Sequence, residues 1–144
     1  MTFDNPILVI GATGKIGSRV ASRMAALDHA HRAVSRSTNP AFNWEDPATW
    51  ADAMRGMRSA FVTYVPDLAA PGAPEVVEHL AAVARAEGLR KIVLLSGRGE
   101  RGAELSEDRL SRSGLDYAVV RASWFNQNFD EGMLLPSILS GTLA

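Results

Sequence analysis

Cysteine is absent from the 144-residue chain, and histidine is scarce. The absence of cysteine excludes disulfides, thiolate catalysis and cysteine-ligated metal sites. The histidines are His29, His31 and His79, and no two of them have the His-x-x-x-His spacing of a helical zinc pair. We therefore expect no structural or catalytic metal in this protein.

A strong charge excess and a long apolar run are also lacking. The net charge is −1, so we expect no nucleic-acid or anionic-membrane surface, which would need a clustered basic excess. No stretch approaches the ~20 apolar residues of a membrane span. Residues 1–6 carry Asp4 and no Lys or Arg, unlike a signal peptide. We expect a cytoplasmic protein, and the length and ordinary composition predict one domain over residues 1–144.

Short apolar runs alternate with longer segments of helical periodicity. Strands are expected at 7–10, 32–35, 59–65, 91–96 and 117–120, and helices at 15–27, 49–57, 75–87, 104–112 and 129–139, the last interrupted by Pro136. This alternation favours a parallel sheet with helices on both faces. We predict an α/β fold of the Rossmann type, with a doubly wound, three-layer parallel sheet of about five strands in the order 3-2-1-4-5.

The strongest local signal is a glycine-rich turn, Gly-Ala-Thr-Gly-Lys-Ile-Gly at residues 11–17, between a predicted strand and a predicted helix. Gly11 permits a sharp turn, Gly14 lets the backbone approach a pyrophosphate closely, and Gly17 lets the helix pack against the strand. The helix N-terminus adds free N–H groups and a partial positive charge. The spacing differs from the commonest dinucleotide fingerprint, and the alternative is a turn that binds nothing. We favour a dinucleotide phosphate site.

The end of the second strand indicates which dinucleotide is bound. An acidic residue there would bind the ribose hydroxyls and favour NAD. This chain instead has Ser35, Arg36 and Ser37. A guanidinium can pair in bidentate fashion with a 2′-phosphate, and the hydroxyls can add hydrogen bonds. We therefore expect NADP(H) to be preferred over NAD(H), the alternative being that Arg36 is a solvated loop residue.

Together these features resemble the NmrA-like family of atypical short-chain dehydrogenases/reductases, over nearly the whole chain. The segments at 91–96, 113–121 and 124–129 also match, and residues 42–50 are similar to an ergot-alkaloid-biosynthesis-like subgroup. With the motif residues, the resemblance implies a cofactor site made of Gly11, Ala12, Thr13, Gly14, Lys15, Ile16, Gly17, Ser35, Arg36, Ser37, Thr63, Tyr64, Val65 and Ser96. It implies a substrate side at Trp124, Phe125 and Asn128.

Two departures from that family affect the expected function. The only lysines are Lys15 and Lys91, so the Tyr-x-x-x-Lys pair is missing and no general acid is identified. Quinone-reducing relatives lack that pair too, and in such chemistry the cofactor carries the reaction. Family members also continue into a second, substrate-binding half. We therefore expect a truncated product, a fragment, or a half that dimerises.

The expected function is that of an NADP(H)-dependent oxidoreductase that transfers a hydride to a small carbonyl, imine or quinone substrate. One alternative is a non-catalytic NADP-binding, redox-sensing regulator of the NmrA type, and another is a remnant that binds no nucleotide. A half-built cleft would leave Trp124, Phe125 and Phe129 exposed, which favours a homodimer. Tyr117 is expected in the core, and Trp44 and Trp50 are expected to be packing anchors.

Overall fold

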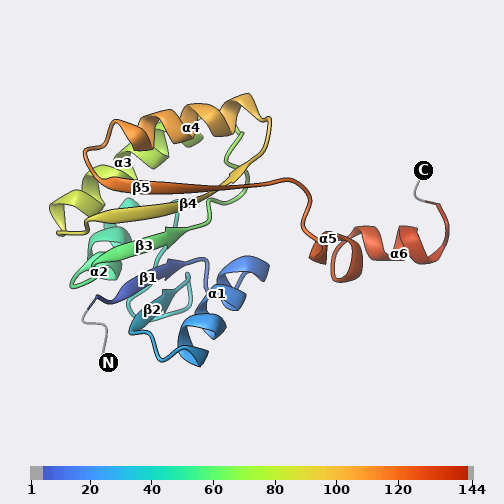
Figure 1. Cartoon of the computed structure of the whole chain (residues 1–144), viewed down its shortest axis with the longest axis horizontal. Coiled ribbons are helices and arrows are strands. Elements are labelled where there is room, and N and C mark those ends of the chain that lie inside the picture. Colours follow the sequence, from blue (N-terminus) through green and yellow to red (C-terminus); the bar gives the residue numbers. More distant parts are fainter. Residues whose placement is uncertain (1–4, 143–144) are drawn as a thin grey trace.

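A five-stranded parallel sheet forms the centre of the protein (Figure 1). The structure is a computed structural model that describes residues 5–142, so most of the N-terminal stretch considered for a signal peptide lies outside the described residues. The strands are β1 (Ile7–Ile10), β2 (His31–Val34), β3 (Ser59–Val62), β4 (Lys91–Gly97) and β5 (Asp116–Ala122). The predicted α/β class with a parallel sheet is confirmed.

The order of the strands is β2-β1-β3-β4-β5, so the predicted order 3-2-1-4-5 is wrong. Ile7 pairs with His31 on one side and with Ser59 on the other, which places β3 beside β1 rather than outside β2. After β2 the chain forms turns with an isolated bridge between Asn43 and Asp46, and no strand extends the sheet there. The direction of chain progression therefore reverses between β1 and β3, and a ligand crevice is expected at such a switch point.

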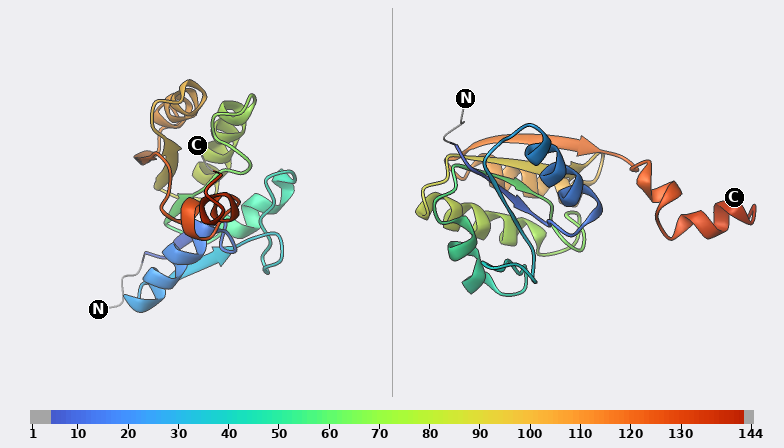
Figure 2. Two further views of the ribbon diagram at one scale, coloured as in Figure 1. Left: turned by 90° about the vertical axis from the view of Figure 1, so that its right-hand side faces the viewer. Right: turned by 90° about the horizontal axis from the view of Figure 1, so that it is seen from below.

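Helices cover the two faces of the sheet unequally (Figure 2). Helix α1 (Lys15–Ala26) covers one face over β1 and β2, while α2 (Trp50–Met54), α3 (Ala73–Ala86) and α4 (Arg101–Ser111) cover the other face. A short 3-10 helix, η1 (Pro47–Thr49), leads into α2. The side chains that point toward α2–α4 form the core, including Leu8, Ile10, Val62, Ile92 and Leu94. The predicted three layers are therefore present.

The face of β3, β4 and β5 that lies beyond α1 is only partly covered. Phe61, Val93 and Leu95 alternate with the core residues of their strands and are half-buried. On β5, Val120 belongs to the same face and is 50% exposed. Within residues 5–142, apolar side chains on this face of the sheet are thus partly in contact with solvent.

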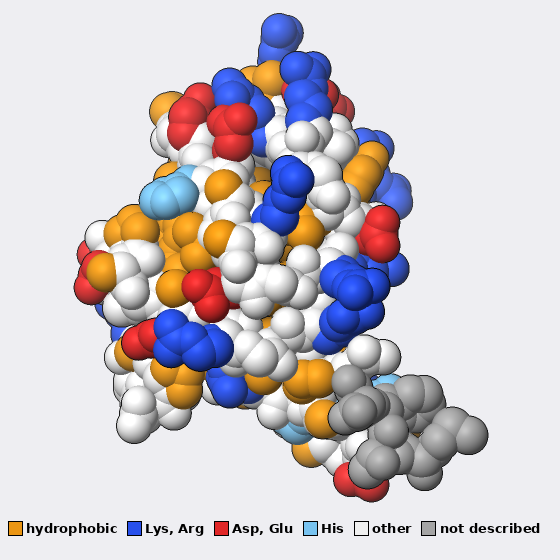
Figure 3. All heavy atoms as spheres, turned by 90° about the vertical axis from the view of Figure 1, so that its left-hand side faces the viewer, with side chains coloured by type: hydrophobic (Ala, Val, Ile, Leu, Met, Phe, Trp, Pro, Cys, Tyr) orange, Lys and Arg blue, Asp and Glu red, His pale blue; other side chains and the backbone are white. Residues whose placement is uncertain are grey.

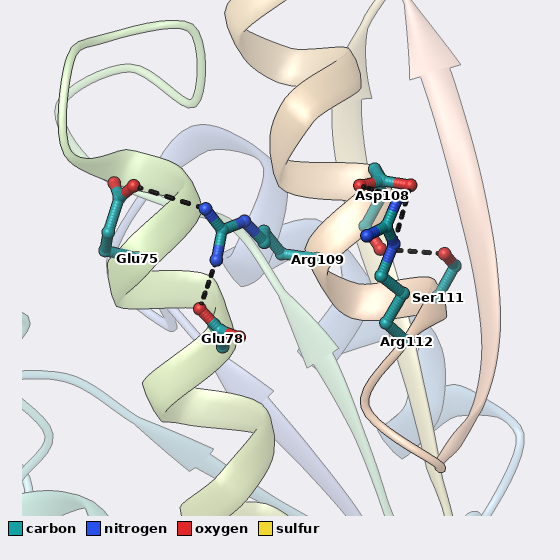
Figure 4. Close-up of polar contacts among 6 residues, drawn as sticks. All are labelled: Glu75, Glu78, Asp108, Arg109, Ser111 and Arg112. Atoms are coloured by element: carbon teal, nitrogen blue, oxygen red, sulfur yellow. Dashed lines mark hydrogen bonds and ion pairs between the residues drawn. The ribbon is translucent and has the colours of Figure 1, made fainter.

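Helices α3 and α4 pack side by side, and Figure 4 shows the ion pairs between them. Arg109 lies between Glu75 and Glu78, with nitrogen–oxygen distances of 3.7 and 2.6 Å. Exposed pairs of this kind contribute only about 0–1 kcal/mol each to stability. Burial of Leu80 and Leu110, both of which belong to the core, contributes more.

The chain after β5 extends away from the sheet as α5 (Gln127–Asp130) and α6 (Leu134–Leu139), as Figures 1 and 2 show. The predicted interruption at Pro136 is wrong, because the break falls between the two helices, around Gly132. Pro136 lies in the first turn of α6, where the missing N–H costs no helical hydrogen bond. As predicted, Trp124 and Phe129 are exposed, whereas Phe125 is half-buried.

The structure confirms the predicted packing of Trp50 and contradicts that of Tyr117. Trp50 is 1% exposed, and its indole N–H donates to the carbonyl oxygen of Asn43 at 2.8 Å, which confirms it as an anchor. Tyr117 is 47% exposed, so its assignment to the core is wrong. The reason is that β5 lies at the edge of the sheet formed within residues 5–142, and sequence periodicity does not show which strand lies at an edge.

The outer surface carries charges of both signs. At the end of the molecule where the strands begin, Lys and Arg side chains share the surface with Asp and Glu side chains and with apolar groups (Figure 3). In this view neither sign covers the face alone. Within residues 5–142, no helix combines the length and the hydropathy needed to cross a bilayer.

Gly17→Ala is expected to destabilise the fold. A Cβ at this position would lie 2.0 Å from the carbonyl oxygen of Gly11, a backbone atom that cannot move without shifting the turn. We expect the free energy of unfolding, measured by urea denaturation, to fall by about 1–3 kcal/mol. Ser22→Ala, at an exposed position of the same helix, should change it by less than about 0.5 kcal/mol. Equal stability of Gly17→Ala and the wild type would contradict this close packing.

Candidate functional site

A pocket of about 410 Å³ opens at the carboxyl ends of β1 and β3, where the chain progression reverses. Open α/β sheets bind ligands at this place. The pocket contains much of the predicted cofactor site together with residues that the sequence analysis did not select. Its lining residues are Ile10, Gly11, Thr13, Gly14, Ser35, Arg36, Phe42, Asn43, Trp44, Glu45, Thr63, Val65 and Pro66.

The glycine-rich turn is held in place by both neighbouring strands. The N–H groups of Gly11 and Ala12 donate to the carbonyl oxygen of Val34, at 3.1 and 3.0 Å. On the other side, the hydroxyl of Thr63 donates to the carbonyl oxygen of Ile10 at 3.0 Å. Gly11 has φ +85°, and a Cβ there would lie 2.5 Å from Thr63 Oγ1. Thr63 therefore fixes the wall of the pocket as well as lining it.

The start of α1 offers backbone N–H groups to an anion. The N-cap residue is Gly14, which has no side chain to cap the helix. The N–H groups of the first turn therefore remain available, beginning with Lys15. A Cβ on Gly14 would lie 3.3 Å from the carbonyl oxygen of Gly11, so the glycine keeps this concave surface open. The missing side chain of Gly14 thus leaves both the helix start and the concave surface open, which fits the close approach of a pyrophosphate. Gly17 lies against the carbonyl oxygen of Gly11, and neither Gly17 nor Ile16 lines the pocket.

Arg36 stands at the rim of the pocket on a turn that closes through hydroxyl groups. The N–H of Ser35 donates to Thr38 Oγ1 at 2.9 Å, and the N–H of Ser37 donates to Ser35 Oγ at 3.3 Å. The guanidinium of Arg36 is exposed and forms no ion pair with any residue between 5 and 142. The turn therefore presents a positive charge toward the solvent side of the pocket. Glu45 provides a carboxylate in the same lining.

Aromatic side chains form one wall of the larger pocket, and the sequence analysis did not assign them to it. Trp44 packs edge-on against Phe42 and Tyr64, each with a ring-centroid distance of 4.9 Å. Trp44 thus packs as predicted, but it also lines the pocket. Residues 42–45 could have been identified from their position. Like Arg36, they follow a parallel strand, β2, at its carboxyl end.

A smaller cavity of about 200 Å³ adjoins the pocket at the carboxyl ends of β3, β4 and β5. Tyr64, Ser96 and Phe125 contribute to its lining, and Thr63 and Pro66 line both cavities. Two predicted residues on the substrate side lie elsewhere. Trp124 is 69% exposed and contacts Phe129, with a ring-centroid distance of 6.0 Å, and Asn128 belongs to α5.

The hydroxyl of Ser96, a residue of the cavity lining, is engaged by a carboxylate. It donates to Glu107 Oε1 of α4 at 2.6 Å, and the Ser96 residue is buried. Arg121 of β5 donates to both oxygens of the same carboxylate, with Nη2 at 2.6 Å from Oε2. These hydrogen bonds, chiefly that from Arg121, lower the pKa of Glu107 against the opposing effect of burial. The hydroxyl proton of Ser96 is thus already used, and the predicted contact of Ser96 with a ribose stays a prediction.

Lys15 and Arg19 connect the glycine turn to the C-terminal helices. Lys15 Nζ donates to the carbonyl oxygen of Gln127 at 3.5 Å, and Arg19 forms an ion pair with Glu131. Lys15 was predicted to line the phosphates; its side chain reaches the carbonyl oxygen of Gln127, and the phosphate contact stays a prediction.

No protein-family model matches the chain. Among curated proteins, an uncharacterized oxidoreductase of Bacillus subtilis, YesF, is 30% identical over 139 residues, which cover 90% of this chain and 48% of the relative. Agroclavine dehydrogenase of Claviceps fusiformis is 30% identical over 142 residues, which cover 85% of this chain and 48% of the relative. The chain thus spans about half the length of the curated relatives it matches.

Solved structures share the fold at lower sequence identity. The triphenylmethane reductase of Citrobacter sp., crystallised with NADP(H), superposes with a TM-score of 0.79 at 15% identity, over 94% of this chain and 55% of that one. A short-chain dehydrogenase/reductase superfamily protein of Agrobacterium tumefaciens with bound NAD gives a TM-score of 0.66 at 18% identity, over 81% of this chain and 48% of that one. The fold is therefore one that holds nicotinamide dinucleotides in both proteins.

Glu107→Gln is expected to change how stability depends on pH. Because Arg121 lowers the pKa of Glu107, the folded protein binds this proton less readily than the unfolded chain does. The charged carboxylate therefore stabilises the fold above the ordinary glutamate pKa of about 4.3, and this contribution is lost as the pH falls through the lowered pKa. In urea denaturation, Glu107→Gln should be less stable than the wild type at neutral pH, with a difference that narrows in acid.

Glu104→Gln, at an exposed position of the same helix, serves as the control for this experiment. Its difference from the wild type should remain small across the same pH range. A difference between Glu107→Gln and the wild type that stays constant from neutral to acid pH would show that the charge of Glu107 contributes no stability.

Proposed function

Because this chain is a relative of oxidoreductases of the short-chain dehydrogenase/reductase type, we propose that it binds NADP(H) at the carboxyl ends of β1 and β3 and supports hydride transfer to a small carbonyl, imine or quinone substrate. The main support is the convergence of the glycine turn, the uncapped start of α1 and Arg36 on one pocket. The glycine turn and the start of α1 suit the pyrophosphate, and Arg36 suits a 2′-phosphate.

The pyrophosphate would lie against the turn at residues 11–14, where glycines leave the backbone accessible and the first N–H groups of α1 have no side-chain cap. Arg36 would pair with the 2′-phosphate, because it is the cation on the rim and has no competing carboxylate partner in residues 5–142. Ser35 and Ser37 hold the turn that carries Arg36, and their hydroxyls bond mainly to each other and to the backbone.

The smaller cavity would receive the reactive end of the cofactor and the substrate. When bound, the nicotinamide supplies the hydride, so the protein has to orient the two partners and limit access of water. Tyr64 and Phe125 provide apolar walls there, which suit a small unsaturated substrate. Trp124 and Asn128, which the family resemblance assigns to the substrate side, line neither cavity and carry no part of this proposal.

Replacing Arg36 tests whether its guanidinium recognises the 2′-phosphate. In calorimetric titrations, Arg36→Ala should weaken NADPH binding by about 1.5–3 kcal/mol, the value of a charged hydrogen-bonded contact, and should leave NADH binding nearly unchanged. Arg90→Ala is the matched control, because Arg90 is exposed and lies just before β4, at the opposite end of the sheet. This control should bind both nucleotides like the wild type.

The same titration has two outcomes that oppose the proposal. No binding of either nucleotide would exclude the cofactor site altogether. Tighter binding of NADH than of NADPH, abolished by Glu45→Gln, would assign ribose recognition to the carboxylate of Glu45 and reverse the proposed preference.

Hydride transfer is tested separately from binding. Phe125→Ala should lower the rate of NADPH oxidation in the presence of a quinone, imine or carbonyl acceptor by about tenfold or more, because the wall that orients the reactants is lost. The dissociation constant of NADPH should change less than the rate does, since Phe125 does not line the larger pocket, which is proposed to hold the phosphates. If the wild type binds NADPH but oxidises it with none of these acceptors, the catalytic part of the proposal is wrong.

A further inference from the structure

A buried carboxylate connects three elements beside the smaller cavity. Glu107 of α4 is 8% exposed and bonds to Ser96 of β4 and to Arg121 of β5. Ser96 and Arg121 are partners in the parallel register of the two strands, so one carboxylate bonds to both strands. Ser96 is 4% exposed and belongs to the lining of the cavity that is proposed to receive the reactive end of the cofactor. A buried charged group is thus hydrogen-bonded to a residue of the candidate site.

Contacts from two directions fix the position of this carboxylate. Arg121 donates from Nη2 to Oε2 of Glu107 at 2.6 Å and from Nε to Oε1 at 3.1 Å, which is a bidentate arrangement. The helix that carries Glu107 is fixed as well, because a Cβ on Gly102 would lie 2.2 Å from the carbonyl oxygen of Ala69. Helix α4 therefore packs directly against the segment after β3, and Glu107 cannot move toward or away from Ser96 without disturbing that contact.

The charge of Glu107 decides the direction of its hydrogen bond with Ser96. The bonds from Arg121 lower the pKa of Glu107, so the group is a carboxylate at neutral pH. An ionised carboxylate only accepts hydrogen bonds, whereas a serine hydroxyl has one proton to donate and two lone pairs. The proton of Ser96 is therefore donated to Glu107 Oε1, at 2.6 Å. Toward any other group, the oxygen of Ser96 can only accept, and donation to the carboxylate strengthens it as an acceptor.

We propose that Glu107, held by Arg121, is a positioning residue that makes Ser96 a hydrogen-bond acceptor for the nicotinamide nucleoside of the cofactor. This inference rests on the proposed function, because it concerns the same cofactor in the same site. The donors at that end of NADPH are the N–H groups of the carboxamide and the hydroxyl groups of the ribose. The reactive oxygen of a carbonyl or quinone substrate is an acceptor, so Ser96 cannot donate to it while Glu107 is charged. Ser96 therefore acts on the cofactor rather than on the substrate.

Glu107→Gln would reverse the direction of this hydrogen bond. A side-chain amide has one accepting oxygen and one donating NH2 group. Arg121 Nη2 donates to Oε2 at 2.6 Å and would retain the amide oxygen there, which leaves the NH2 group at the position of Oε1. That NH2 group would donate to Ser96, whose own proton would then face the donors of the cofactor. The variant therefore opposes cofactor binding although it leaves the Ser96 side chain in place.

The test is calorimetric titration of the purified protein with two ligands. One is NADPH, and the other is 2′-phosphoadenosine 5′-diphosphate, which keeps the adenosine phosphates and lacks the nicotinamide nucleoside. Ser96→Ala and Glu107→Gln should each weaken NADPH binding by roughly three- to tenfold, the value of one hydrogen bond. Both variants should bind the second ligand like the wild type, which also shows that they are folded.

Two variants of α4 are matched controls. Ser106→Ala removes another buried hydroxyl, which does not line the cavity, and Glu104→Gln removes an exposed charge near Arg121. Both should keep the wild-type ratio of the two affinities. A 3-acetylpyridine analogue of NADPH, which lacks the carboxamide N–H groups, identifies the donor. If it binds equally to the wild type and to Ser96→Ala, the donor is the carboxamide, and a persisting difference assigns the ribose hydroxyls.

The proposal is wrong if Ser96→Ala binds NADPH like the wild type, and a raised KM for a carbonyl or quinone acceptor would then assign Ser96 to the substrate. It is also wrong if Glu107→Gln weakens both ligands equally, because Glu107 would then only support the fold. Either result leaves the proposed function standing. Binding of neither ligand by the wild type would instead exclude the cofactor site, and this inference with it.

Discussion

The candidate site depends on the close approach of α1 to the end of β1. Gly17 brings the helix so near to the carbonyl group of Gly11 that no side chain fits between them. This contact directs the uncapped start of α1 toward the switch point between β1 and β3. The hydroxyl of Thr63 then fixes the end of β1 from the opposite side. The concave surface, its available N–H groups and its position beside Arg36 all follow from this one packing constraint.

The sequence predicts the parts of the structure that depend on neighbouring residues. The glycine turn, the first helix and the buried strands can all be recognised because their residues determine local conformation directly. The strand order depends on which distant segments pair, and here the polar segment after β2 does not add a strand beside it. The orientation of Ser96 depends on the register of β4 against its neighbours, and the bond to Glu107 of α4 could not be inferred from spacing.

Helices cover one face of the sheet, and residues 5–142 cover the other face only in part. Helices α2–α4 bury one face of β3–β5, while the opposite face keeps Val93, Leu95 and Val120 partly in solvent. The chain spans about half the length of the curated relatives it matches. Within residues 5–142 it has a candidate nucleotide pocket at the switch point and a partly exposed apolar surface over β3–β5.

Because Arg36 is exposed, its attraction for a phosphate depends on the salt concentration of the solution. Its guanidinium stands at the rim of the pocket in contact with water, and no carboxylate in residues 5–142 pairs with it. The attraction of such a charge for a phosphate is screened over about 8 Å at physiological ionic strength, and over shorter distances in concentrated salt. Any discrimination between the two nicotinamide dinucleotides that rests on Arg36 is therefore tuned by the ionic composition of the solution as well as by the protein.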